Sequence, residues 1–196
     1  LINFISNYLN KFNSKYISVH FVGGEPLLCQ SKCREIIKSL YDYLDNHHII
    51  CMTSLTTNLT LPLTEDAYIL FDLLGKINVS IDGNELQHNT QRRSLTLVDN
   101  PYQKTINNLK ILINKGLRDK IHIKGAINDD DYTGDNYREF LLTMADIGVL
   151  LDNINYGCLH PTDLKHDSVK LRTFRSLYGS KPLSMPCCKY RYNHVW

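Results

Sequence analysis

The stretch Ile17-Ser18-Val19-His20-Phe21-Val22-Gly23-Gly24-Glu25-Pro26-Leu27-Leu28 contains a strand pattern that stops at two glycines, a carboxylate and a proline. The β-branched and aromatic run predicts a strand, and the proline predicts a turn before the next segment. Because Gly23 and Gly24 lack Cβ atoms, a ligand can lie against the backbone at the end of this strand. Glu25 offers acceptor oxygens that suit an ammonium group. The alternative interpretation is a tight turn with a solvated glutamate.

Strand and helix patterns alternate along the rest of the chain. We expect further strands near residues 49–57, 77–81, 120–127 and 150–156. We expect helices at the start of the chain and near residues 31–45, after an N-cap at Thr64, near 105–115 up to Gly116, and near 136–147; residues 84–104 have the composition of a polar loop. This alternation predicts right-handed βαβ units and a parallel sheet.

The composition excludes several classes of protein. The 196 residues have a formal charge of +2 with acids and bases interspersed, so we expect no nucleic-acid partner. No apolar run has the length of a membrane span and no signal peptide is visible in the given residues, so we expect a cytoplasmic protein without a membrane partner. The six cysteines are irregularly spaced, which favours reduced thiols or a metal site over a disulfide framework. Because the chain begins at Leu1 inside an amphipathic pattern, we interpret it as an internal piece of a longer protein.

Polar residues occur where successive predicted strands end. They are Glu25, Asn58, Ser80 with Asp82, and Asn128. Parallel α/β sheets and barrels collect their active sites at the carboxyl ends of the strands, so we expect these side chains to share one mouth. Each also has a structural alternative: Asn58 and Asp82 can belong to turns, and Asn128 can cap the next helix.

These motifs resemble the radical S-adenosylmethionine superfamily, and in particular its SPASM-type peptide- and protein-modifying maturases. The stretch from His20 to Leu28 resembles the family's Gly-Gly-Glu-Pro strand. Thr56-Thr57-Asn58-Leu59-Thr60 is similar to its Thr-Asn-Gly-Thr turn, with Leu59 where glycine is usual. Val79-Ser80-Ile81-Asp82-Gly83, followed by His88-Asn89 and Arg92, is similar to its Ser-Leu-Asp-Gly, His-Asp and Arg series, with Asn89 in place of aspartate.

The resemblance implies a fold and a set of cofactor contacts. The expected fold is an α/β, partial parallel (β/α) TIM-like barrel of the radical SAM type, with its first strand missing and an exposed edge beside residues 17–22. Gly23, Gly24 and Glu25 would hold the methionyl ammonium of S-adenosylmethionine, Arg92 its carboxylate, and Ser80 and Asn128 its ribose. Asn58 belongs to the same expected cofactor site. Asp82 is the candidate catalytic residue, either as a polar anchor or as a proton acceptor.

The family's Cys-xxx-Cys-xx-Cys loop, which holds a 4Fe-4S cluster, is not present in these residues. Cys29 and Cys33 imitate half of it after the wrong strand, and we expect both to be packed thiols. We therefore expect the cluster ligands upstream of residue 1. Residues 1–160 form the expected barrel core, and residues 161–196 a C-terminal helix and the start of an auxiliary iron-sulfur extension. There Cys187 and Cys188 are either metal ligands or ordinary thiols.

The leading hypothesis is a radical SAM enzyme that generates a 5′-deoxyadenosyl radical to modify a peptide or protein, and that needs an electron donor. The 196-residue chain alone would be inactive because the cluster thiolates are absent. The alternative is a catalytically silent barrel that acts as a binding or scaffold module. A phosphate-binding barrel has little support, because no strand end carries a glycine-rich phosphate loop.

Overall fold

The fold is an open sheet of five parallel strands whose spatial order follows the chain. The computed structural model describes residues 2–92, 99–127 and 134–158. The strands are β1 (Tyr16–Phe21), β2 (Ile50–Thr57), β3 (Lys76–Ser80), β4 (Ile121–Ile127) and β5 (Ile154–Cys158). The α-helices are α1 (Ile2–Phe12), α2 (Gln30–Asp45), α3 (Glu65–Leu73), α4 (Glu85–Gln91), α5 (Pro101–Leu112) and α6 (Gly134–Asp146). The predicted strand-helix alternation is confirmed over these residues.

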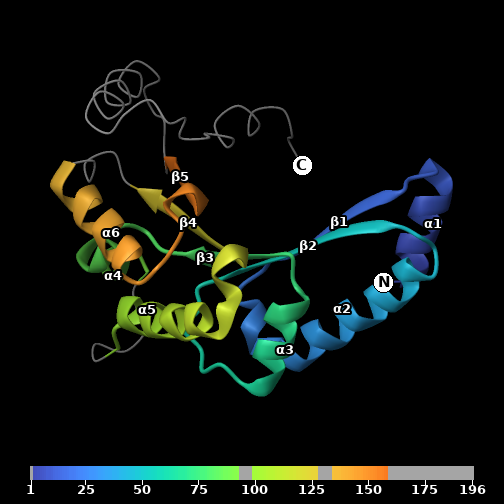
Figure 1. Cartoon of the computed structure of the whole chain (residues 1–196), viewed down its shortest axis with the longest axis horizontal. Coiled ribbons are helices and arrows are strands. Elements are labelled where there is room, and N and C mark those ends of the chain that lie inside the picture. Colours follow the sequence, from blue (N-terminus) through green and yellow to red (C-terminus); the bar gives the residue numbers. More distant parts are fainter. Residues whose placement is uncertain (1, 93–98, 128–133, 159–196) are drawn as a thin grey trace, which may run out of the picture.

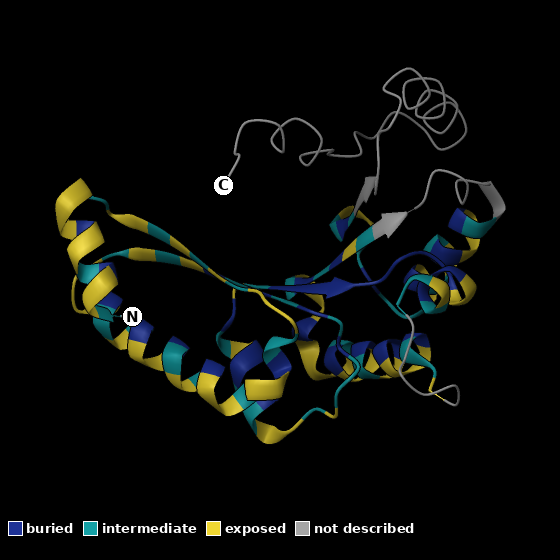
Figure 2. Ribbon diagram, turned by 180° about the vertical axis from the view of Figure 1, so that it is seen from behind, coloured by how far each residue is buried: buried dark blue, intermediate teal, exposed yellow. Residues whose placement is uncertain are grey.

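The helices cover one face of the sheet. Helices α2, α3 and α5 lie along that face, and no described helix lies on the opposite face of β1, β2 and β3 (Figures 1 and 2). The main core joins the strands to the helices through fully buried side chains that include Leu55, Ile77 and Ile123 from the strands, with Phe71 and Phe140 from the helices. Since alternate side chains of a strand point to opposite faces, the intervening strand residues line the uncovered face.

Capping explains where two of the helices begin. The predicted N-cap Thr64 accepts a hydrogen bond from the backbone N–H of Ala67 at the start of α3. Helix α4 begins at a capping box, in which the Asn84 side chain accepts from the backbone of Gln87 and the Gln87 side chain accepts from the backbone of Asn84. Gly83 precedes this box with φ of 85°, a conformation that favours glycine.

Three sequence-based boundaries are wrong. Residues 85–91 were expected to be a loop, but they form α4. The capping box of Asn84 and Gln87 starts this helix, and the sequence-based prediction did not take it into account. Helix α5 begins at Pro101, four residues before the expected start, since Asn100 caps it and proline suits the first helical turn. Strand β5 begins at Ile154, because residues Leu151–Asn153 form a 3-10 turn.

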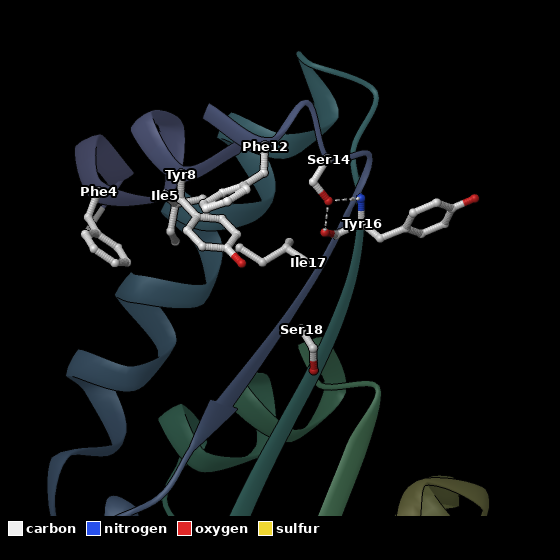
Figure 3. A pocket seen from close by; sticks show the side chains of 8 residues that line it. All are labelled: Phe4, Ile5, Tyr8, Phe12, Ser14, Tyr16, Ile17 and Ser18. Atoms are coloured by element: carbon white, nitrogen blue, oxygen red, sulfur yellow. Dashed lines mark hydrogen bonds between the residues drawn. The ribbon is translucent and has the colours of Figure 1, made fainter. Parts of the chain in front are cut away.

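Strand β1 lies at an edge of the described sheet, where it pairs only with β2. Beside this edge a groove of about 520 Å³ separates α1 from β1. Figure 3 shows aromatic side chains of α1, among them Phe4, Tyr8 and Phe12, along this groove. The Ser14 hydroxyl donates to the Tyr16 carbonyl and accepts from the Tyr16 N–H, so it satisfies the backbone at the beginning of the strand (Figure 3). The exposed edge predicted at residues 17–22 is therefore present among the described residues.

Candidate functional site

Glu25 joins the end of β1 to the end of β2. Its Oε1 accepts from the Leu27 N–H at 3.0 Å and from the Thr57 hydroxyl at 2.7 Å. Its Oε2 accepts from the Asn58 N–H at 2.8 Å. The half-buried carboxylate is therefore not the solvated turn residue of the alternative interpretation. Because each carboxylate oxygen can accept two hydrogen bonds, Oε2 keeps room for one further donor.

Gly23 and Gly24 leave open space beside this carboxylate. A Cβ atom at either position would meet no atom within 4 Å, and both residues are exposed. The backbone at the end of β1 is therefore accessible to a ligand, as the sequence predicted. An accessible backbone next to an acceptor oxygen suits the α-ammonium group of an amino acid.

Asn58 serves the turn that follows β2. Its Oδ1 accepts from the Thr60 N–H at 3.0 Å and from the Thr60 hydroxyl at 2.8 Å, which is the turn-closing role considered from sequence. Its backbone carbonyl accepts from Thr105 of α5 at 2.8 Å. The next residue, Leu59, has φ of 57° and a fully buried side chain. A leucine thus takes the left-handed conformation that the family usually gives to glycine.

Asp82 and Arg92 form an ion pair beyond the end of β3. The Asp82 carboxylate accepts from Arg92 Nε at 2.5 Å and from Arg92 Nη2 at 3.3 Å, a forked arrangement that fixes the guanidinium plane. The Asp82 side chain is 4% exposed and the Arg92 side chain 37% exposed. The remaining N–H groups of Arg92 can therefore still reach a ligand, whereas the buried Asp82 carboxylate cannot.

His88 supports this ion pair from α4. Its Nδ1 accepts from the Asp82 backbone N–H at 3.2 Å, so the other ring nitrogen, Nε2, carries the proton in the neutral form. Burial, opposed by the Asp82 charge and assisted by the Arg92 charge, lowers the pKa of His88 to about 4. The ring is therefore neutral near pH 7, and buried Nε2 has no hydrogen-bond partner among the described residues.

A cavity of about 220 Å³ collects part of this constellation. Its lining comprises residues from the loop after β2, from α4 and from the beginning of α5: Asn58, Thr60, His88, Arg92, Asp99, Pro101 and Lys104. The volume lies below the roughly 300 Å³ at which small-molecule pockets usually begin. This cavity can therefore take only one end of a cofactor-sized ligand. It brings together two predicted cofactor residues, Asn58 and Arg92, that are far apart in the sequence.

Sequence reasoning overlooked two residues of the site. Thr57 was quoted in a motif but given no role, although its hydroxyl holds Glu25 and accepts from the Leu59 N–H at 2.8 Å. His88 was also given no role. The sequence feature that could have identified His88 is its position six residues after Asp82. A turn followed by one turn of helix brings residues at this spacing close together. Ser80 ends β3 as predicted and is buried, whereas Asn128, Cys187 and Cys188 lie outside the described residues.

The described cysteines do not form a cluster site. Cys33 is buried and its thiol lies 3.7 Å from the Pro26 carbonyl, which confirms the expected packed role. The same expectation is wrong for Cys29, which is exposed at the N-terminus of α2. Within residues 2–92, 99–127 and 134–158, no group of three or more histidine, cysteine, aspartate or glutamate residues can hold a metal ion. These residues therefore do not fit a 4Fe-4S cluster. The acceptor oxygen of Glu25 beside the open backbone of Gly23 and Gly24 suits an ammonium group, and the half-exposed guanidinium of Arg92 suits a carboxylate.

The family described as "4Fe-4S single cluster domain" matches residues 3–106. The chain belongs to this family. Membership in the 4Fe-4S single cluster domain family, a radical SAM family, agrees with the motifs in β1, β2 and β3, which all lie within the matched range. A comparison with curated proteins found no match.

Solved structures of anSMEcpe, an anaerobic sulfatase-maturating enzyme, share the fold. The structure with bound AdoMet and Kp18Cys peptide has a TM-score of 0.63 and 17% sequence identity, over 84% of this chain and 47% of that one. The structure with bound AdoMet and Cp18Cys peptide has a TM-score of 0.66 and 17% identity, over 84% of this chain and 47% of that one. The chain thus spans less than half the length of these relatives. The likeness confirms the expected α/β architecture, a partial radical SAM barrel.

None of the helices in the described part of the chain is long and apolar enough to cross a bilayer.

Proposed function

We propose that this chain is the S-adenosylmethionine-binding part of a radical SAM enzyme that modifies a peptide or protein. The observation that supports the proposal best is the position of Glu25, which has one free acceptor site beside the open backbone of Gly23 and Gly24. In this family, bound S-adenosylmethionine supplies the chemistry of hydrogen abstraction from the substrate. Support for a peptide substrate comes from anSMEcpe, whose structures carry bound AdoMet and a peptide.

Each residue of the site has a distinct task under this proposal. Glu25 accepts a hydrogen bond from the methionyl ammonium, and Arg92 donates to the methionyl carboxylate. Asp82 is a positioning residue, because its carboxylate holds the guanidinium in a forked ion pair and is itself nearly inaccessible. Its buried, paired state favours the polar anchor over the proton acceptor of the two roles considered from sequence. Ser80 and Asn128 keep the ribose contact that the resemblance implies.

A catalytically silent binding module is the second candidate. Two observations favour it. The described part of the chain has no group of three metal-ligating residues, and Leu59 and Asn89 replace the glycine and the aspartate that are usual in the family's motifs. Asn89 has a structural task here, since its Oδ1 accepts from the Tyr102 N–H at 3.1 Å and its Nδ2 donates to Asn100. This departure from the family pattern therefore stabilises the beginning of α5.

Calorimetric titration of S-adenosylmethionine into the 196-residue chain tests the proposal. We expect binding, and a loss of about tenfold or more in Arg92→Lys, because lysine keeps the charge opposite Asp82 but loses the fork. Arg118→Lys, on an exposed 3-10 turn, is the matched control and should bind like the wild type. No binding by the folded wild type, or equal affinity in both variants, would reject the assignment of this site to S-adenosylmethionine.

A further inference from the structure

The uncovered face of the sheet is polar and basic. The side chains that alternate away from the core on the strands include Ser18, His20, Ser54, Thr56, Lys76, Asn78, Ser80, His122, Lys124 and Asn155, and we call this set the open face. A face that packs against another layer of protein is normally apolar. Among the described side chains, the open face has its exposed large hydrophobic residues at its far end, where Tyr16, Ile50 and Met52 lie.

Lys76 and Lys124 give the open face its charge. They lie on neighbouring strands: Ser80, four residues after Lys76, is the register partner of Lys124. None of the described strand residues on this face is acidic, and neither lysine forms an ion pair within the described ranges. Partial burial and the neighbouring Lys76 lower the pKa of Lys124. Burial, followed by the charges of Lys76 and Lys124, lowers the pKa of His122 to about 4, so His122 is neutral near pH 7.

His20 is held in place on this face by two hydroxyl groups. Its Nδ1 lies 2.5 Å from the Ser54 hydroxyl and its Nε2 lies 3.0 Å from the Thr56 hydroxyl. Burial, followed by the charge of Lys124, lowers the pKa of His20. The ring is therefore a fixed neutral group near pH 7, and the positive charge of the open face belongs to the two lysines.

Two polar atoms of the open face have no hydrogen-bond partner in the described part of the chain. They are Oδ1 of Asn78 and Nδ1 of His122, on register-paired residues of β3 and β4. Asn78 is 1% exposed, and its Nδ2 donates to the Leu55 carbonyl at 3.3 Å. Buried polar atoms without partners are uncommon in folded proteins and point to a polar group that completes the site. Because both atoms are buried, an occupant of this face meets the two lysines and needs acceptors for them.

We propose that the open face binds an acidic segment of the substrate peptide, whose carboxylates pair with Lys76 and Lys124. An acidic peptide meets this requirement, because its carboxylates accept hydrogen bonds from both lysines. The location is suitable as well: Lys124 is level with Ser80, the last residue of β3, so a peptide on this face reaches the strand ends where Glu25 and Asp82 lie. The inference rests on the proposed function for the peptide nature of the substrate and adds its charge.

Fluorescence anisotropy tests the proposal with a labelled Gly-Ser peptide that contains several glutamates, and with the same peptide in which every glutamate is glutamine. We expect the acidic peptide to bind the wild-type chain about tenfold or more tightly than the glutamine peptide at low salt. The double variant Lys76→Gln/Lys124→Gln should lose this preference. The control Lys38→Gln/Lys110→Gln changes the net charge equally on exposed helical positions and should keep it.

Several results would overturn the proposal. Equal binding of the two peptides by the wild type, or an equal loss in the control variant, would mean that the open face does not select carboxylates. Displacement of the acidic peptide by inorganic phosphate or a single-stranded oligonucleotide at lower concentration than by unlabelled peptide would assign the face to phosphates instead. The proposed function can fail separately from this inference. If the chain does not bind S-adenosylmethionine but still prefers the acidic peptide through Lys76 and Lys124, the inference about the open face holds and the proposed enzymatic function is rejected.

Discussion

Replacement of Glu25 by glutamine probes the junction between β1 and β2 most directly. The carboxylate accepts hydrogen bonds from the Leu27 N–H, the Thr57 hydroxyl and the Asn58 N–H. Glutamine has a single carbonyl oxygen, and its amide nitrogen is a donor. In the best orientation the oxygen takes the place of Oε1 and keeps two of the bonds. The nitrogen then faces the Asn58 N–H, so a donor meets a donor.

The expected cost follows from these contacts. One backbone N–H of a half-buried turn loses its acceptor, which costs about 1–3 kcal/mol, and the two remaining bonds lose their charge assistance. We expect Glu25→Gln to lower the free energy of unfolding by about 2–3 kcal/mol. For a chain of this size, this corresponds to roughly 4–12 °C in Tm. Because Oε2 is also the proposed ammonium acceptor, S-adenosylmethionine binding should weaken in the same variant.

Urea denaturation of the wild type, Glu25→Gln, Thr57→Val and the double variant measures this cost. The two substitutions should be non-additive, because Thr57→Val removes the 2.7 Å hydrogen bond whose charge assistance Glu25→Gln removes. Glu35→Gln is the control, since Glu35 makes only an exposed pair with Lys32 at 3.2 Å and should change stability by less than about 1 kcal/mol. If Glu25→Gln is no more destabilising than Glu35→Gln, the carboxylate does not join the two strands and this reasoning fails.

Three further predictions concern other described residues. Leu59→Gly should relieve about 1 kcal/mol of left-handed strain at φ of 57° but lose a fully buried side chain, so urea denaturation should report a net destabilisation of about 2–4 kcal/mol; a gain in stability would contradict this. The pKa of His88 is lowered to about 4, so the stability that His88 contributes is complete above about pH 6.5 and falls by roughly 3 kcal/mol as the pH falls toward 4. His88→Gln should flatten this part of the pH–stability curve. An unchanged curve would exclude His88 as the source of the pH dependence. Exposed Cys29 should react with a maleimide faster than Cys33, whose pKa is raised by burial, when labelling is followed by peptide mass mapping; equal rates would mean that α2 does not shield Cys33.

Much of the fold could be predicted from local sequence. Strand β1 and its stop at Gly23, Gly24 and Glu25 follow from side-chain period and backbone freedom, which are properties of neighbouring residues. The parallel order of the strands follows from the lengths of the segments that connect them. Helix α4 was missed because its capping box is reciprocal, and a single asparagine in a polar stretch resembles a loop residue until Gln87 is considered with it.

The sequence by itself determined the residue types of the site, and the tertiary structure decided their tasks. A glutamate after two glycines predicts a hydrogen-bond acceptor. Only the position of β2 in the structure shows that the Thr57 hydroxyl and the Asn58 N–H already donate to this carboxylate. Asp82 and Arg92 were assigned separately from sequence, because a hydrogen bond between residues ten positions apart depends on how α4 folds back over the end of β3. The placement of Lys76 and Lys124 on one face required the register of β3 and β4. The sequence periodicity gives the face of each strand, but it does not give which residues of other strands lie beside it.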